Sequence, residues 1–344
     1  MPALYWRGPR LRTHRVSQKY PLRLVSTAAY LPEKVIDNNE IMRQMGSNGD
    51  GNLLYRAVGA KEKRVAAKDE MGSDMLARVG LKILKESGTD PSSIDKLICS
   101  CDPPDQAAPD TAVVTQTKMG LSCPAFGVSM SCVGWIAGVN IANGFLANGD
   151  KKILALSAST VGSKYFFKNP MHRAIFGDGA GGVLVERNEK ANQILRIDLL
   201  AIGQFYKDIF APHRWTHVPD EIPERYKDAF FMLPDNRLFF EALDTHIKPF
   251  FQRQFEVTGL KMDDIDHFVV HQASMPLFNY TVESFKIPKG RVLDSFWRYG
   301  NTISAELPIL LDEAVRQGKI KKGNLVYLLT YGAGFTAGAM IIRF

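Results

Sequence analysis

The segment Gly88-Thr-Asp-Pro-Ser-Ser-Ile-Asp-Lys-Leu-Ile-Cys99 has a similar counterpart in the second half of the chain, Gly259-Leu-Lys-Met-Asp-Asp-Ile-Asp-His-Phe-Val-Val270. Two apolar runs, Ile153–Leu156 and Leu325–Leu328, are separated by nearly the same offset. Both offsets are close to half of the 344 residues in the chain. Each match is weak by itself, but two matches at nearly one offset predict a duplicated domain. We place the two halves at residues 21–190 and 191–344.

Short apolar runs alternate with amphipathic stretches along the chain. The expected strands are Leu22–Ser26, Leu97–Cys101, Ala125–Val128, Ile153–Ser157, Gly182–Glu186, Phe268–His271, Leu325–Tyr331 and Ala339–Phe344. The expected helices are Met75–Glu86, Val133–Ala147, Phe239–Phe255 and Ile303–Gln317. Such alternation predicts an α/β protein with mostly parallel sheets. The segment Phe205–Arg237 has no clear period and is expected to be an insertion or cap.

The composition excludes several classes of protein. Apolar residues make up 45% and charged residues 23% of the chain, which is ordinary for a globular protein and excludes disordered, collagenous and coiled-coil chains. Of the net charge of +7, an arm at residues 1–20 with five basic and no acidic residues carries +5. The body is therefore nearly neutral, which argues against nucleic acid as a partner.

The chain shows no recognisable targeting signal, membrane span or disulfide framework, so we expect a soluble, cytoplasmic protein. The arm lacks the apolar core of a secretory signal. The uncharged run Met119–Gly149 contains Pro124 and several Gly and Asn residues, which are unfavourable in a membrane-spanning helix. Four cysteines form no disulfide framework. Cys99, Cys101 and Cys123 lack metal-site spacing, so we expect them to be structural and expect no metal.

Two glycine clusters have nucleotide-site spacing. Gly177–Gly182 fits the pattern G-x-G-x-x-G, but the strand Val183–Glu186 follows where a dinucleotide site needs a helix. Gly332–Ala337 follows a strand, yet only seven residues remain after it. Tight turns explain both clusters better, and no cofactor is expected.

Three residues are candidates for a catalytic site. Cys132 opens an apolar helix whose dipole would stabilise a thiolate, although buried structural cysteines are commoner. His271 ends a strand, at the edge where α/β proteins build their sites. Asn301 precedes a helix, where it also suits a cap. Each has a structural explanation, but Cys, His and Asn at element edges together are used in thioester chemistry.

The sequence resembles β-ketoacyl-acyl-carrier-protein synthase III and its relatives in the thiolase superfamily over about residues 21–344. The matching stretches are Leu31-Pro-Glu33, Met130-Ser-Cys132-Val-Gly134, Phe176-Gly-Asp-Gly-Ala180, His271-Gln-Ala-Ser274, Gly300-Asn301-Thr302 and Tyr331-Gly-Ala-Gly-Phe335. The resemblance implies a thiolase-like, duplicated five-layered α/β/α/β/α fold and a homodimer.

The same resemblance implies a mechanism. Cys132 would be the acylated nucleophile, and His271 and Asn301 would bind the carbonyl of the extender and stabilise its enolate. The backbone N–H groups of Cys132 and Ala333 would form the oxyanion hole. The substrates would be acyl and malonyl or β-ketoacyl thioesters of coenzyme A or acyl carrier protein. Claisen condensation would serve fatty-acid or secondary-metabolite biosynthesis.

The departures from the family pattern concern the substrate. The region Asn52–Gly59 lacks the Trp that stacks on adenine in coenzyme A-dependent members, and basic residues expected near Pro276 and Glu283 are missing. A different basic patch is therefore expected to bind the acidic carrier protein. Its candidate residues, besides the arm, are Arg237, Lys286, Lys289 and Arg291.

The acyl pocket departs from the family pattern as well. Ala108 replaces a bulky aromatic residue in a loop that lines the partner subunit's acyl site in this family, which predicts acyl chains longer than acetyl. The aromatic pairs Phe230-Phe231 and Phe239-Phe240 are the candidates to fill that space instead.

Two alternatives stay open at this stage. A type III polyketide synthase or alkylquinolone-type synthase shares the Cys-His-Asn set. An inactive partner subunit of a heterodimeric synthase is the non-enzymatic alternative, although such subunits commonly lose the nucleophile, which this chain keeps.

Overall fold

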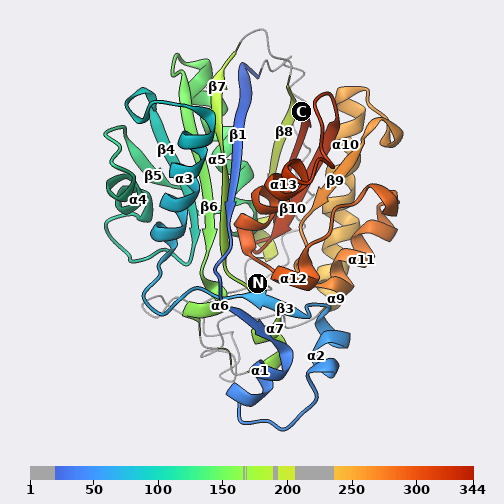
Figure 1. The fold of residues 1–344 in the computed structure, drawn as a ribbon. Helices are drawn as coiled ribbons and strands as arrows, with labels where there is room; N and C mark the ends of the chain where they lie inside the picture. The colour runs from blue at the N-terminus through green and yellow to red at the C-terminus, as the bar shows by residue number, and fades with distance from the viewer. Residues whose placement is uncertain (1–19, 166, 168, 189–192, 206–235) are drawn as a thin grey trace, which may run out of the picture.

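The computed structural model describes residues 20–165, 167, 169–188, 193–205 and 236–344 (Figure 1). Residues 1–19 of the expected arm, the pair Phe230-Phe231 and nearly all of the expected cap lie outside the described residues. Tyr20, the last residue of the expected arm, is buried, and its hydroxyl donates to the Ile197 carbonyl at 3.2 Å. The arm at residues 1–20 stays a prediction.

The first sheet has five strands in the order β1-β7-β6-β4-β5. Their bounds are β1 Leu22–Tyr30, β4 Lys96–Asp102, β5 Ala125–Gly127, β6 Lys152–Ser159 and β7 Gly179–Arg187. Strand β4 pairs in parallel with β5 and β6, whereas β7 is antiparallel to β1 and β6.

The second sheet has four strands in the corresponding order, β8-β11-β10-β9. Their bounds are β8 Ile194–Ala201, β9 His267–Val270, β10 Leu325–Gly332 and β11 Thr336–Arg343. Only β9 and β10 are parallel. The expectation of mostly parallel sheets was wrong, because the turn between β10 and β11 is too short for the crossover that parallel strands need. A small antiparallel pair, β2 Val35–Asp37 and β3 Glu62–Arg64, lies apart from both sheets.

The helices complete five layers. The helices of the first half of the chain are α1 Asn38–Gln44, α2 Gly51–Val58, α3 Gly72–Ser87, α4 Thr111–Met119, α5 Gly134–Ala147, α6 Val161–Lys164 and α7 Pro170–Ile175. Those of the second half are α9 Asn236–Ala242, α10 Lys248–Thr258, α11 Met275–Ser284, α12 Phe296–Tyr299 and α13 Glu306–Arg316. A π-helical turn, Leu243–Ile247, joins α9 to α10, so the helix expected at Phe239–Phe255 is interrupted.

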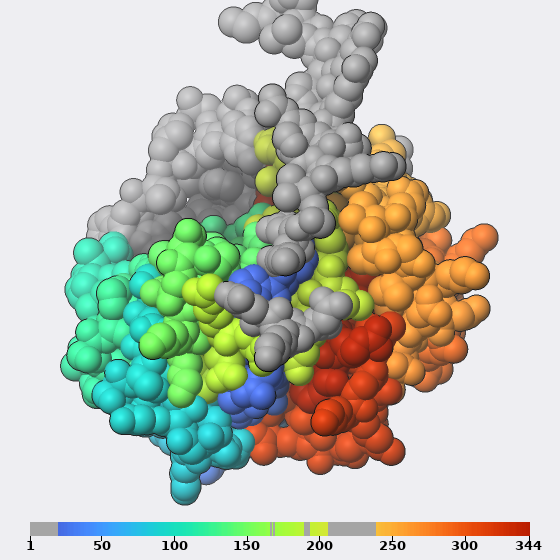
Figure 2. All heavy atoms as spheres, turned by 90° about the horizontal axis from the view of Figure 1, so that it is seen from above, coloured from blue at the N-terminus to red at the C-terminus, as the bar shows by residue number. Residues whose placement is uncertain are grey.

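Three buried clusters hold these layers together. Side chains of α5 and α13 fill the space between the two sheets, while α3 and α4 cover the outer face of the first sheet and α10 and α11 that of the second. Strand residues alternate between layers: Ile153 and Ala155 face the central helices, whereas Leu154 and Leu156 face α3 and α4. Figure 2 shows the first half, in blue to green, against the second, in orange and red.

The repeated segments make the same contacts in both halves. Gly88 ends α3 and Gly259 ends α10, each in the left-handed conformation that favours glycine, with φ of 64° and 72°. The Asp95 backbone N–H donates to the Lys152 carbonyl and that of Asp266 to the Leu325 carbonyl, both at 2.9 Å. Each aspartate carboxylate then accepts from that partner's N–H, at 2.9 and 2.8 Å. The limits of the two halves, residues 21–190 and 191–344, stay a prediction.

Candidate active site

Cys132 lies in a tight turn between a strand and a central helix. The 3₁₀ turn Ser131–Val133 directly precedes α5, so Cys132 stands just before the helix that it was expected to open. Thr330 of β10 holds this turn, because its hydroxyl donates to the Cys132 carbonyl at 2.8 Å. Gly332 must be small here, since a Cβ on it would lie 2.9 Å from the Cys132 Cβ and 3.0 Å from its Sγ.

His271 is the first residue after β9 and is completely buried. Its backbone N–H donates to the Leu329 carbonyl at 2.8 Å, which continues the register of β9 with β10. Its Nδ1 is in ion-pair contact with the Glu306 carboxylate, which is also buried. Burial by itself would lower the pKa of His271, but the Cys132 and Glu306 side chains outweigh it and raise that pKa to about 10.

Asn301 is buried and held on both sides of its amide. Its Oδ1 accepts from the Ile303 backbone N–H at 2.7 Å, and its Nδ2 donates to the Ala273 carbonyl at 3.4 Å. Its own backbone N–H donates to the Ile175 carbonyl at 2.8 Å. These contacts fix which end of the amide carries the donor.

One pocket of 390 Å³ joins these residues, although they come from three distant parts of the chain. Cys132, His271, Asn301 and Ala333 all line it. The rest of its wall is largely apolar and includes Val161, Phe176, Phe239, Phe240, Leu277 and Ile303. A largely apolar pocket with a thiol, an imidazole and an amide is suited to binding an acyl chain and transferring it.

Two family models match the chain. The model described as 3-oxoacyl-[acyl-carrier-protein (ACP)] synthase III matches residues 126–203, and the model for its C-terminal part matches residues 255–344. The β-ketoacyl-[acyl-carrier-protein] synthase III of Oenococcus oeni is 30% identical over 94% of this chain and 99% of its own length. The chain belongs to the β-ketoacyl-[acyl-carrier-protein] synthase III family. Another relative of that description, from Xanthomonas campestris pv. campestris, is 29% identical over 96% of this chain and 100% of its own.

Solved structures of β-ketoacyl synthase III proteins have the same fold. The enzyme from Aquifex aeolicus superposes with a TM-score of 0.84 and 27% identity, over 94% of this chain and 100% of that one. OleA from Xanthomonas campestris, at 21% identity, shares the fold with a TM-score of 0.81 over 96% and 98% of the two chains. The expectation of a thiolase-like α/β fold is confirmed, and the protein is a condensing acyltransferase that performs Claisen condensation in fatty-acid or related biosynthesis.

Two acidic residues of the synthase site were missed by the sequence analysis. Asp102, at the end of β4, lines the pocket, and burial raises its pKa to about 6 although a hydrogen bond from Ser304 opposes that shift. Glu306 lies behind His271. A signal for Glu306 was present, since a lone carboxylate starts the largely apolar run Glu306–Leu311.

The remaining cysteines differ from Cys132. Cys99 and Cys123 are buried and Cys101 is partly buried, and none of them lines the pocket. Burial raises the pKa of all three thiols, which disfavours their nucleophilic thiolate form. Within the described part of the chain, no group of three or more His, Cys, Asp or Glu residues is placed to hold a metal ion.

The residues expected to bind a carrier or the acyl chain are only partly assembled. Lys286 and Lys289 are exposed near the end of α11, but Lys289 is paired with Glu283 at 2.9 Å. Arg291 donates to the Asp263 and Ile265 carbonyls at 2.9 and 3.0 Å. The side chain of Arg237 lies outside the described residues.

Ala108 is exposed in the loop after β4 and does not line the pocket of its own chain. Its expected place was the pocket of a partner subunit, so that assignment stays a prediction. Of the two aromatic pairs considered for filling the space, Phe239 and Phe240 do line the pocket.

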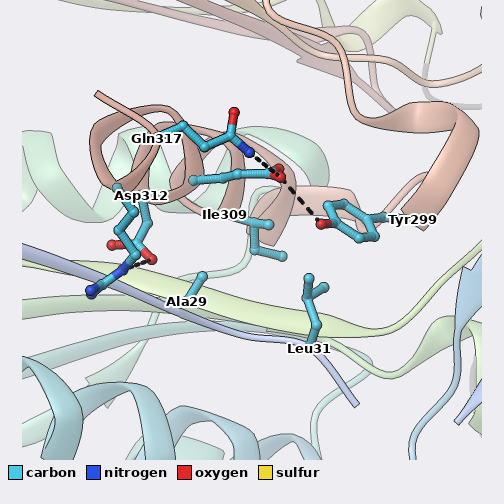
Figure 3. A pocket seen from close by; sticks show the side chains of 8 residues that line it. Ala29, Leu31, Tyr299, Ile309, Asp312 and Gln317 are labelled. Atoms are coloured by element: carbon cyan, nitrogen blue, oxygen red, sulfur yellow. Dashed lines mark hydrogen bonds and ion pairs between the residues drawn. The ribbon is translucent and has the colours of Figure 1, made fainter. Parts of the chain in front are cut away.

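A second pocket, of 320 Å³, lies between β1 and α13 (Figure 3). Its acidic side chains are neutralised by neighbouring arginines, because Asp312 accepts from Arg316 and Glu313 from Arg298. It contains no thiol or imidazole, so it lacks the groups for acyl transfer. None of the helices in the described residues is long and apolar enough to span a bilayer.

Proposed function

We propose that Cys132 is the acylated nucleophile of a ping-pong Claisen condensation in which His271 and Asn301 serve the extender. The observation that carries the proposal is the single pocket that all three side chains line. The assignment also agrees with family membership, but it is made on these residues individually.

In the first half-reaction, the Cys132 sulfur attacks the carbonyl carbon of an acyl thioester and displaces the carrier thiol. Negative charge develops on the carbonyl oxygen, and backbone N–H groups aimed at that oxygen stabilise it. The N–H groups of Cys132 and Ala333 are the proposed donors. Support comes from Gly332, which sets the β10–β11 turn directly against Cys132.

In the second half-reaction, a malonyl or β-ketoacyl thioester enters the same pocket. Its thioester carbonyl accepts hydrogen bonds from His271 and from the Asn301 amide, which stabilises the enolate that attacks the Cys132-bound acyl group. The contact between Asn301 Oδ1 and the Ile303 N–H supports this role, because it commits the amide oxygen to the backbone and leaves Nδ2 as the donating end.

The acyl donor is proposed to be longer than acetyl. The pocket has 390 Å³ of space even with Phe239 and Phe240 in its wall, which is more than a two-carbon group needs. The carrier is proposed to be acyl carrier protein or coenzyme A, with Lys286 and Lys289 as the exposed part of the docking patch. The product would enter fatty-acid or secondary-metabolite synthesis.

A homodimer is proposed because Ala108 can line a pocket only across a subunit interface. Strand β5 supports this assembly, since it stands at the edge of the first sheet and, within the described residues, pairs only with β4. The four cysteines are unpaired, as is usual in a reducing compartment, which supports a cytoplasmic location.

Intact-mass spectrometry after incubation with acyl thioesters of two to twelve carbons tests the proposal. We expect one acyl adduct on the wild type, mapped to the peptide that contains Cys132, and none on Cys132→Ala. Cys123→Ala is the matched control and should acylate normally. An adduct on another peptide would contradict the assignment of Cys132. A protein that no thioester acylates would instead favour the inactive partner subunit.

A further inference from the structure

Glu306 is a buried carboxylate that the condensation described above does not use. It is the first residue of α13, and its side chain is only 2% exposed in its contact with His271. Both its oxygens also accept from the Gln272 backbone N–H, at 3.1 and 3.2 Å. The positive end of the α13 dipole favours negative charge at this position. Backbone and helix therefore stabilise an anion beside the imidazole.

The other titratable groups near His271 do not replace this carboxylate. Cys132 is the other side chain that raises the pKa of the imidazole, and the Tyr331 ring stands edge-on to it with 6.0 Å between the ring centroids. Burial raises the pKa of Tyr331 well above its ordinary value, so this phenol stays neutral. Across the pocket stand Asp102, whose pKa of about 6 reflects burial, and His172, whose pKa burial lowers. Glu306 is thus the anion in direct contact with Nδ1.

We propose that Glu306 is a positioning residue that fixes the charge and orientation of His271, so that His271 and Cys132 rest as an imidazolium–thiolate pair. A carboxylate against Nδ1 holds a proton on that nitrogen and leaves Nε2 for the pocket that Cys132 also lines. The raised pKa of His271 agrees with this arrangement. The inference rests on the proposed function of Cys132 and extends it with the group that activates the thiol.

The protons balance over one turnover with a malonyl extender. The Cys132 thiolate forms the new C–S bond while the bond to the carrier sulfur breaks, and the departing thiolate takes the Nε2 proton of His271. Neutral His271 keeps its Nδ1 proton against Glu306 and regains the Nε2 proton from solvent. It then donates Nε2–H to the extender carbonyl while carbon dioxide leaves. Carbon–carbon bond formation releases the Cys132 thiolate and restores the resting pair.

Ultraviolet titration of the thiolate near 240 nm, on the full chain without substrate, tests the inference. We expect the wild-type thiolate signal to persist below the ordinary cysteine pKa of about 8.5. In Glu306→Gln, which keeps the shape but loses the charge, the midpoint should rise by about one to three pH units. Acylation at pH 7 should fall with the thiolate fraction, by about tenfold for each pH unit by which the midpoint rises above 7, and should recover at pH 9.

Asp312→Asn is the matched control. Asp312 is a second buried carboxylate on α13, but it accepts from Thr27 at 2.7 Å and from Arg316 at 2.8 Å and stands in the second pocket (Figure 3). Its replacement should leave the thiolate titration unchanged. Asp102→Asn should remove any inflection near pH 6 without moving the thiolate midpoint. A wild-type titration in Glu306→Gln would overturn the inference.

Two further measurements keep the outcomes distinct. If Glu306→Gln does not fold, the pH dependence of wild-type Cys132 alkylation by iodoacetamide decides, and a midpoint at the ordinary value of about 8.5 would overturn the inference. If the signal near 240 nm survives in Cys132→Ala, the thiolate belongs to another cysteine and the inference fails, whereas the absence of an acyl adduct on Cys132 would reject the proposed function itself. A normal acyl adduct on Cys132 with an unperturbed titration would leave the proposed function intact and reject only the role of Glu306.

Discussion

The turn that carries Cys132 has a counterpart in the other half of the molecule. Ser131–Val133 precedes α5, and Ile303–Ala305, separated from it by the offset of the repeat, precedes α13. Both are 3₁₀ turns, and both begin with a non-glycine residue in the left-handed region, with φ of 45° at Ser131 and 54° at Ile303. That conformation costs on the order of 1–2 kcal/mol for each residue. Because the strain occurs in both turns, it belongs to the repeat and is not by itself a sign of catalysis.

The two turns differ in what surrounds their central residue. Cys132 opens into the pocket beside His271, whereas Ser304 is buried against Ser157 at 2.7 Å and Ser100 at 3.3 Å. Ser100 and His271 are separated by the offset that relates the repeated segments, so they occupy corresponding places after the start of corresponding strands.

The residues that begin the two central helices differ in the same way. Gly134 is the first residue of α5 and Glu306 the first of α13, and the offset of the repeat relates them too. The site around Cys132, which both halves build, therefore has a carboxylate behind its histidine where the corresponding site around Ser304 has no side chain. The duplicated backbone supplies the same turn twice. A few side chains give only the turn at Cys132 the groups for catalysis.

Replacing Cys132 should have the largest effect, because it removes the one nucleophile that distinguishes the first turn from the second. We expect Cys132→Ala to lose acylation by more than about 10³-fold. Rapid-quench acylation followed by intact-mass detection measures this. Residual acylation above about one per cent of wild type would show that another side chain, Ser304 included, substitutes for the thiol.

Asn301 should have the next largest effect, and it should fall on one half-reaction. Asn301→Asp keeps an oxygen to accept from the Ile303 N–H, so the second turn is preserved, but it loses the Nδ2 donor. Condensation should fall about 10²–10³-fold, the usual loss for one positioned donor. Acylation of Cys132 should change less than about tenfold in a single-turnover assay. Equal losses in the two steps would place Asn301 in the acylation machinery instead.

The duplication and the three site residues could be predicted from the amino-acid sequence. The Ile94-Asp95 and Ile265-Asp266 repeats predicted the duplication because the same residues make the same strand-end hydrogen bonds. The three residues Cys132, His271 and Asn301 stood out because each ends or begins an element, and the ends of parallel neighbours such as β9 and β10 meet at one sheet edge. Sequence reasoning therefore reached the residues that local element boundaries mark.

The misses have physical reasons too. Glu306 meets His271 only through tertiary packing of α13 against β9, and no local pattern records a contact between a helix and a strand that lie far apart in the sequence. Asp102 ends β4 directly before Pro103, one residue beyond the strand that the sequence predicted, so its place in the pocket was not predicted. The antiparallel partners of β7 and β11 were missed because apolar runs do not encode strand direction.

Strands β4 and β9 occupy corresponding places in the two halves, but the loops that follow them have different roles. Replacing Ala108 tests this difference. The loop after β9 supplies His271, whereas that after β4 is proposed to reach a partner's acyl pocket. Ala108→Phe should shorten the preferred acyl chain, with about 0.8 kcal/mol, or roughly fourfold in rate, for each methylene excluded. Acylation rates against chain length for both proteins measure the shift. A wild type that prefers acetyl and does not respond to the Phe would contradict it.

Ser304 should matter least for chemistry and mainly for stability. Ser304→Ala should leave acylation within about twofold, because this hydroxyl belongs to the turn Ile303–Ala305, which does not carry the nucleophile. It donates to Asp102 at 3.3 Å and so stabilises the charged carboxylate. Loss of a hydrogen bond to a charged group costs about 1.5–3 kcal/mol, more than the roughly 1 kcal/mol of a neutral one.

The pH dependence of that cost follows from Asp102. Burial raises its pKa from the ordinary 3.8 to about 6, so the folded protein favours the neutral acid, and the associated stability is present below pH 3.8 and lost as the pH rises through 6. Removing the Ser304 hydroxyl raises that pKa further. Urea unfolding should therefore show a larger destabilisation by Ser304→Ala at pH 8 than at pH 4. In an Asp102→Asn background the difference between the two pH values should vanish. If the pH difference in destabilisation persists, a group other than Asp102 titrates, and that group couples the turn Ile303–Ala305 to the turn Ser131–Val133.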